Sequence, residues 1–410
     1  MHKSRQNRSA VFLLSALFVV LAGCTTQTVK KVNVEPAQHA ERDIPPAELL
    51  NVNISVFDSN VPVDIEEREK RNIYPGVRDT EARYMPYNLR RTLQDTGHWG
   101  AVRVVPEEIE TSELLVTGKI MHSDGELLKL KIVATDATNR VWLDKTYDQQ
   151  TARLSYTPEA TAVQKDPFQG IYNQIANDLL EVRRDISSQE IVEIRRVSEV
   201  RFAADLAPES FNPYLTKKGE RYKLLGLPAA DDPNVQRIAR IRDRDYALID
   251  ALDQHYGLFY QQVDPAYDEW RSSSYRETVK LQELRKQALS RKLLGAAAII
   301  AGIVGVIEGG GQTASIASQG AIIGGGVLVA SGIQKGRESE LHAEALKELG
   351  QSLESDLKPR VVELEGQTVT LSGSAEAQYE EWRRILREIY AAETGFATTS
   401  ESDQRKQKDL

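Results

Sequence analysis

The chain has 410 residues, 41% of them hydrophobic, so it is long enough for two or three domains with buried cores. This excludes a wholly disordered or fibrous protein. The formal net charge of −8 argues against a nucleic-acid-binding protein, and we expect no nucleic-acid partner. The single cysteine, Cys24, excludes a disulfide framework, a cysteine-rich zinc site and a CxxC redox pair within one subunit.

The first residues have the pattern of a secretory signal. A basic start at residues 2–8 precedes an almost unbroken apolar run from Ser9 to Leu21, which is too short for an ordinary transmembrane helix. The run ends in Leu21-Ala22-Gly23-Cys24, which resembles the lipobox of bacterial lipoproteins. The alternative is a plain secretory signal followed by a buried cysteine.

The lipobox resemblance implies a lipid anchor. In that family the sulfur of Cys24 receives a diacylglycerol, a peptidase removes residues 1–23, and the new amine is acylated. Thr25 stands where an aspartate would signal inner-membrane retention, so the resemblance implies attachment to outer-membrane lipid, facing the periplasm of a Gram-negative cell. Acyl chains contribute ~0.8 kcal/mol per buried CH₂ group, so several of them anchor a protein stably. We expect no cofactor besides these covalent lipids.

Residues 24–48 are polar and proline-containing, so we expect a lipidated tether, and residues 49–186 then carry strand and helix patterns. Glu81–Thr96 predicts a helix that ends at Gly97, and Asp166 predicts the cap of a second helix with Pro167 at its first position. The charged stretch from Pro62 to Asp79, which precedes the first of these helices, predicts a loop with one helical turn. The strand patterns are Leu50–Phe57, Ala101–Val105 leading into Glu113–Ile120, Leu127–Thr135 and Val141–Tyr147.

This order of strand, helix, meander and helix predicts an α+β layer. It resembles the amino-terminal domain of TolB and the periplasmic α/β domain of the curli-secretion lipoproteins. The matching stretches are Leu115–Ile120, Leu128–Val133 and Val141–Tyr147. The resemblance implies a periplasmic α/β domain used for protein contacts and ring assembly, with other envelope proteins and further copies of this chain as partners.

Residues 187–292 predict a region of long charged helices, interrupted between Pro208 and Pro233. Apolar residues recur there at coiled-coil-like spacing: Ile238, Ile241, Leu248, Leu252 and Phe259. They predict a helical hairpin packed on itself or coiled-coil packing in an oligomer. Asp245 and His255 lie nearly three turns apart on one helix, so we do not expect them to share a ligand.

Charge disappears from residues 293–333 except at Glu308, and two apolar helix patterns flank a glycine-rich turn. We expect a Gly/Ala-rich apolar helical hairpin. Small residues at four-residue spacing predict membrane or helix packing between its arms: Ala297, Ala301, Gly305, Gly309, Gly320 and Gly324.

This hairpin permits two interpretations. An arm of fifteen residues reaches only ~22 Å, which is short for a standard bilayer but close to the ~25 Å apolar band of outer-membrane barrels. Basic residues on both sides of the hairpin favour entry and exit on the same side of the membrane. Burial of the hairpin inside the protein or an oligomer explains the same glycines and alanines.

Residues 338–395 predict a small α-β-β-α unit, followed by a polar tail at 396–410 for which we expect disorder. Gly366–Gly373 resembles the G-x-V-x-L-x-G hallmark of BON domains, with one extra residue before the valine. The resemblance implies a role at envelope and phospholipid surfaces. The third strand of that family is not evident here, and the alternative is a helix-hairpin-helix cap without a ligand.

The sequence contains no HExxH, GxSxG or P-loop motif, and its histidines are scattered, so we predict neither catalytic nor metal-ligating residues. We expect a non-catalytic structural or assembly component of a cell-envelope complex. The alternative is an oligomeric export-channel subunit whose glycine-rich hairpins line a pore, and an envelope hydrolase is a more distant third.

Overall fold

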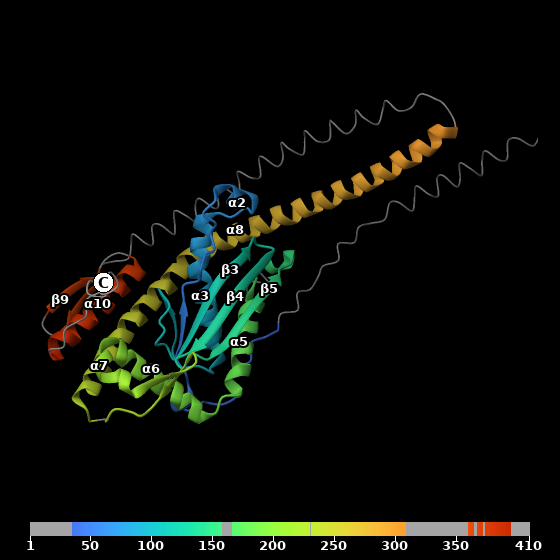
Figure 1. Cartoon of the computed structure of the whole chain (residues 1–410). Helices are drawn as coiled ribbons and strands as arrows, with labels where there is room; N and C mark the ends of the chain where they lie inside the picture. Colours follow the sequence, from blue (N-terminus) through green and yellow to red (C-terminus); the bar gives the residue numbers. More distant parts are fainter. Residues whose placement is uncertain are drawn as a thin grey trace, which may run out of the picture. The chain divides into compact units, whose positions relative to one another are not determined.

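The computed structural model describes residues 35–157, 166–229, 231–308, 360–364, 367–371 and 374–394. The chain divides into two units, Met1–Asn33 and Val34–Leu410, and all described residues belong to the second. This unit is mixed α/β and contains a five-stranded mixed sheet (Figure 1). None of the described helices has a stretch that is both long and apolar enough to cross a membrane.

The sheet has the strand order β2-β1-β3-β4-β5. Its strands are β1 (Val52–Ser55), β2 (Val102–Val105), β3 (Leu114–Ser123), β4 (Leu127–Asp136) and β5 (Val141–Gln150). The last three strands form the predicted antiparallel meander. The expectation that Ala101–Val105 leads into this meander is wrong, because β1 lies between β2 and β3 and pairs in parallel with both. Parallel strands require a crossover, and a helix between β1 and β2 supplies it.

One face of the sheet is packed under helices. The covering helices are α3 (Pro75–Thr96) and α5 (Gln169–Arg184), which share a core with the sheet. Along β4 the inward side chains are buried, whereas alternate positions such as Lys129 are half-buried or exposed. Strand β4 therefore has the one-sided apolar pattern of an antiparallel strand with one face packed, whereas all four residues of β1 are buried, as in a parallel strand covered on both faces.

Helix α3 begins at Pro75, earlier than the predicted start at Glu81. Proline suits a first helical turn, because the backbone N–H that it lacks would have no hydrogen-bond partner within the helix there. The short helix α2 (Ile65–Lys70) occupies the preceding stretch. The predicted end of α3 is confirmed, since Gly97 adopts a φ of 72°, a left-handed conformation that glycine adopts without strain.

Helices and a short hairpin fill the region after α5. They are α6 (Ser188–Leu206), α7 (Pro208–Phe211), the hairpin of β6 (Leu215–Lys218) and β7 (Arg221–Leu224), and α8 (Pro233–Glu308). Helix α6 begins with a capping box between Ser187 and Glu190. The hairpin lies in the proline-flanked interruption, where the sequence pattern predicted only a break.

Helix α8 is continuous from Pro233 to Glu308, so the predicted boundary between residues 292 and 293 falls inside one helix. Its apolar seam packs against other elements of the same chain. Leu248 and Leu252 lie in a core with Val104 of β2 and Phe202 of α6. The sheet edge and α6 supply the apolar partner that the helical spacing alone could not identify.

The carboxy-terminal hairpin and helix are confirmed as β8 (Arg360–Leu364), β9 (Gln367–Leu371) and α10 (Ala375–Thr394). The first helix of the predicted α-β-β-α unit and the tail at 396–410 lie outside the described residues. Helix α10 buries one face in the core that it shares with α6 and α8, through Tyr379, Trp382, Leu386 and Tyr390.

Candidate functional site

The small residues predicted to pack helices fall into two groups. Ala297, Ala301 and Gly305 lie in the last turns of α8, where their four-residue spacing places them on one face of the helix. The remaining predicted site residues, Cys24, Gly309, Gly320 and Gly324, lie outside the described residues. The lipidation of Cys24 and the packing of the second arm therefore stay predictions.

A polar cluster is buried where α8 crosses α3 and the start of α5. We call it the α8 junction and define it by Glu81, Tyr84, Asp166, Tyr267 and Arg271. Each of these residues is at most 2% exposed. Sequence patterns did not identify the cluster, because its members come from three distant segments; the only local signal is the four-residue spacing of a tyrosine and an arginine on α8.

The centre of the α8 junction is an ion pair. Arg271 Nη1 lies 2.8 Å from Asp166 Oδ2, and the ring centroids of Tyr84 and Tyr267 lie 5.5 and 4.4 Å from the Arg271 guanidinium carbon. Burial opposes the charge of Arg271, but the Asp166 carboxylate together with Tyr84, Tyr267 and Asp268 outweighs burial and raises the pKa of Arg271 above its ordinary value. The other Asp166 oxygen accepts the Phe168 N–H at 2.7 Å. Asp166 thus precedes α5 rather than capping its first turn as predicted, and it joins α5 to α8.

A second buried carboxylate extends the junction toward β3. Glu81 Oε1 accepts hydrogen bonds from the Tyr267 hydroxyl at 2.7 Å and the Ser123 hydroxyl at 2.6 Å. The Tyr84 hydroxyl donates to Asp264 Oδ1 at 2.5 Å. Burial raises the pKa of Tyr84 and of Tyr267, so both phenols remain protonated donors. At Glu81 Oε1 and Asp264 Oδ1, donors from the protein thus replace the water that is lost on folding.

The turn between β3 and β4 touches the α8 backbone directly. Gly125 has a φ of 77°, and a Cβ atom at this position would lie 2.4 Å from the Arg271 carbonyl oxygen and 2.9 Å from the Tyr275 nitrogen. Beside it, the Ser274 hydroxyl donates to the Asp124 carbonyl oxygen at 2.7 Å. The α8 junction therefore combines a buried ion pair with close backbone contact, an arrangement that fixes a helix in place.

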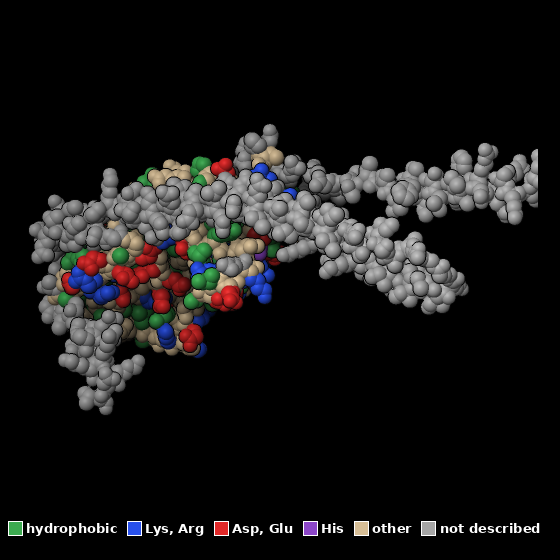
Figure 2. Space-filling model, turned by 90° about the horizontal axis from the view of Figure 1, so that it is seen from above, with side chains coloured by type: hydrophobic (Ala, Val, Ile, Leu, Met, Phe, Trp, Pro, Cys, Tyr) green, Lys and Arg blue, Asp and Glu red, His purple; other side chains and the backbone are tan. Residues whose placement is uncertain are grey.

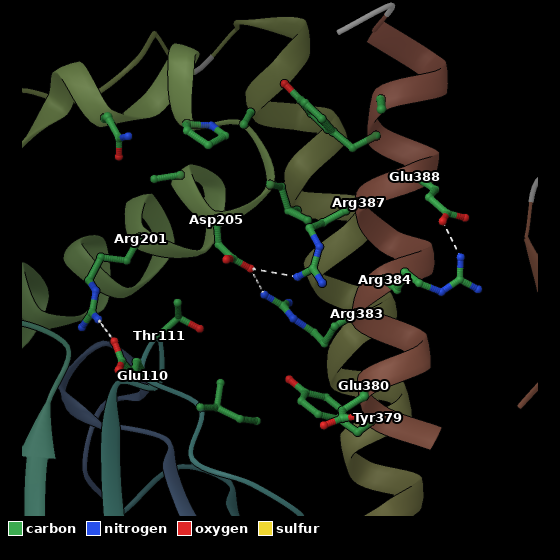
Figure 3. Close-up of a pocket in the computed structure, with 18 of the residues that line it drawn as sticks. Glu110, Thr111, Arg201, Asp205, Tyr379, Glu380, Arg383, Arg384, Arg387 and Glu388 are labelled. Carbon is green, nitrogen blue, oxygen red and sulfur yellow. Dashed lines mark hydrogen bonds and ion pairs between the residues drawn. The ribbon is translucent and has the colours of Figure 1, made fainter. Parts of the chain in front are cut away.

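A groove of about 1550 Å³ lies between α6, α7, the β2–β3 connection and α10 (Figure 3). We call it the α10 groove. Eight carboxylates belong to its lining: Glu107, Glu108, Glu110, Asp205, Glu209, Glu380, Glu381 and Glu388. Four guanidinium groups also belong to it: Arg201, Arg383, Arg384 and Arg387. The lining is therefore acidic, and Figure 2 shows that acidic side chains gather on part of the described surface.

The arginines of the α10 groove are already paired. Their partners are Glu110 for Arg201, Asp205 for Arg383 and Arg387, and Glu381 and Glu388 for Arg384 (Figure 3). Among the described residues, the other lining carboxylates have no ion pair: Glu107, Glu108, Glu209 and Glu380. Burial and the neighbouring Glu380 carboxylate raise the pKa of Glu107, so these two acids repel each other across the groove.

The wall of the α10 groove also holds an unpaired hydroxyl. Tyr379 is 1% exposed, and its hydroxyl has no hydrogen-bond partner among the described residues. A buried polar group left without a partner costs about 1–3 kcal/mol. In the part of the chain that the structure describes, no group of three or more His, Cys, Asp or Glu side chains is arranged to hold a metal ion.

The comparisons with known proteins gave no relative. No protein-family model, no curated protein and no solved structure matches the chain.

Proposed function

We propose that the protein is an outer-membrane lipoprotein that acts as a non-catalytic structural component of a cell-envelope complex. The observation that carries this proposal is the continuity of α8, which joins the core of the α/β unit to the Gly/Ala-rich segment in one helix. A continuous helix holds its two ends at a separation of about 1.5 Å per residue, which suits a scaffold.

The first part of α8 is held by the α/β unit. Asp250 Oδ1 lies 2.5 Å from Arg103 Nε, and Gln282 Nε2 donates to Glu126 Oε2 at 2.5 Å. The helix then continues to Glu308, a further ~40 Å at about 1.5 Å per residue. This length separates the docked part of α8 from its end, so we propose that α8 acts as an arm.

The two ends of this arrangement have different roles in the proposal. Lipid on Cys24 holds the chain at the outer membrane, and the segment 293–333 either enters the membrane or packs against other copies of the chain. The α/β unit contacts other envelope proteins in the periplasm. The polar α8 junction supports this division, because it is enclosed and offers no surface for a substrate.

The experiment compares the wild type with Cys24→Ser, expressed as full chains in a Gram-negative host. We expect mass spectrometry to find diacylglycerol and an N-acyl chain on Cys24 of the wild type, which fractionates with outer membranes. Cys24→Ser is expected to remain uncut or soluble in the periplasm. An unmodified Cys24 in the wild type, or an acylated serine variant in the outer membrane, overturns the proposal.

Negative-stain imaging of the detergent-solubilised protein separates scaffolding from the export-channel alternative. Small solid particles support the scaffold. Rings with an open lumen support the channel, in which several glycine-rich hairpins line a pore.

A further inference from the structure

We propose that the α10 groove binds a lysine- or arginine-rich segment of a partner protein. This inference deepens the proposed function. It rests on that function only where it identifies the partner as another envelope protein. It concerns a surface on α6, α10 and the β2–β3 connection, which the scaffold proposal leaves without a role.

The charge of the groove is the first argument. Each arginine of the lining is engaged by carboxylates of the same groove, so Glu107 and Glu380 make no ion pair in the described structure, although the Arg383 guanidinium partly opposes the rise in the pKa of Glu107. They come from two different elements, the β2–β3 connection and α10 (Figure 3 labels Glu380). A cation between them would relieve their mutual repulsion.

The Tyr379 hydroxyl is the second, independent argument. It belongs to the groove wall, is buried and lacks a partner among the described residues. A bound segment satisfies it in two ways, since a phenol accepts from a guanidinium or ammonium group and donates to a peptide carbonyl. An orphaned buried hydroxyl beside unpaired carboxylates is therefore typical of a site that a ligand completes.

The size of the groove favours a polypeptide over a small molecule or ion as its ligand. Its volume of about 1550 Å³ exceeds the ~300–1,000 Å³ of pockets for small molecules. Its lining runs along successive turns of α10, from Ala377 to Ala391. An extended segment with several cationic side chains matches both the length of this wall and the charge of the lining.

The internal pairs of Arg383 explain why the groove stays acidic. Asp205 on α6 pairs with Arg383, and Asp245 Oδ2 on α8 lies 3.7 Å from Arg383 Nη1. These contacts hold Arg383 against the helices behind the groove, with only 12% of its side chain exposed. Arg383 thus fixes α10 in place; it acts on the pKa of Glu107 from a distance but makes no ion pair with Glu107 or Glu380 among the described residues.

The test measures peptide binding by fluorescence anisotropy, with the full chain in detergent. The probe is a labelled Gly/Ser peptide that contains four arginines, and the matched peptide has glutamine at those positions. The double variant Glu107→Gln/Glu380→Gln removes the unpaired carboxylates of the groove. The control Glu66→Gln/Glu67→Gln removes two exposed carboxylates from α2, so both proteins have the same net charge.

We expect the wild type and the α2 control to bind the arginine peptide at least about tenfold more tightly than the groove variant. Binding should weaken with added salt and should be weak for the glutamine peptide. Equal binding by the groove variant and the control overturns the proposal, as does equal binding of the two peptides.

Tyr379→Phe separates a binding role from a structural one. We expect this variant to bind the arginine peptide several-fold more weakly while its thermal unfolding is unchanged or moves to higher temperature, because an unpaired hydroxyl has been removed. Lower stability with unchanged peptide affinity overturns the role of Tyr379. Cys24→Ser is expected to bind the peptide as the wild type does, so failure of the anchor and failure of the groove are distinguishable.

Discussion

Arg271 of α8 and Asp166 before α5 form an ion pair that is sealed from solvent, with 2.8 Å between Nη1 and Oδ2 and exposures of 2% and 0%. Removing each charge from water costs several kcal/mol, and their attraction offsets this only when other hydrogen bonds complete the site. Asp166 receives such bonds from the Phe168 N–H and from Asn88 Nδ2, and Arg271 also pairs with Asp268. The pair is therefore a place where loss of one partner leaves an uncompensated buried charge.

Arg271→Met should destabilise the protein by about 3–5 kcal/mol, because it leaves the Asp166 carboxylate buried without its cation. The measurement is the free energy of unfolding from urea titration. Arg384→Met is the matched control, since Arg384 is 51% exposed and its ion-pair partners among the described residues are carboxylates of its own helix. Exposed pairs contribute little, so we expect the control to change stability by less than about 1 kcal/mol. Equal effects of the two substitutions would contradict the central role of the buried pair.

Gly125→Ala should lower the free energy of unfolding by about 2–4 kcal/mol. The positive φ strains an alanine by roughly 1–2 kcal/mol, and the new Cβ would also meet the Arg271 carbonyl oxygen at 2.4 Å. Gly219→Ala isolates the first effect, because Gly219 has a φ of 66° and no described residue lies within 4 Å of the added atom. Thermal and urea unfolding of both variants provide the comparison, and a Gly219→Ala cost as large as that of Gly125→Ala would refute direct contact with α8.

Asp245 predicts a defined pH dependence. Burial raises the pKa of its carboxyl to about 6, although the Arg383 guanidinium opposes this shift. The unfolded chain releases this proton from about pH 4 upward, whereas the folded protein retains it until about pH 6. The neutral Asp245 carboxyl therefore contributes most to the stability of the folded state below about pH 4. This contribution is lost as the pH rises through about 6.

Asp245→Asn tests the assignment, because asparagine stays neutral at every pH. The stability of the wild type relative to Asp245→Asn should fall by about 3 kcal/mol between about pH 3 and pH 7 and stay constant above that range. Urea unfolding at a series of pH values measures this difference. A constant difference between the two proteins, or one that grows with pH, would exclude a raised pKa at Asp245.

Local sequence patterns identified what neighbouring residues determine. Alternation predicted the meander of β3, β4 and β5, and the glycine after the predicted helix marks the end of α3. Those patterns could not determine long-range partners. The seam residue Leu252 fits a coiled coil equally well, and only the fold shows that it packs near β2. Asp166 looked like a helix cap, since its partner Arg271 lies 105 residues away. The α10 groove was missed for the same reason, because distant segments assemble it.

The last prediction concerns the continuity of α8 beyond its docked part. Spin labels at Glu269→Cys and Ala298→Cys, in a Cys24→Ser background, lie ~44 Å apart along one helix at about 1.5 Å per residue. Double electron–electron resonance should give one narrow distance distribution near this value.

Ala288→Pro lies between the labels, removes a helical hydrogen bond and clashes with the preceding turn, so it should broaden and shorten the distribution. Ala288→Leu keeps the helix and serves as the control. Urea unfolding of the α/β unit should be unchanged by Ala288→Pro, because the contacts of Asp250 and Gln282 precede it. A broad distribution without the proline would contradict an uninterrupted arm and remove the observation on which the scaffold proposal depends.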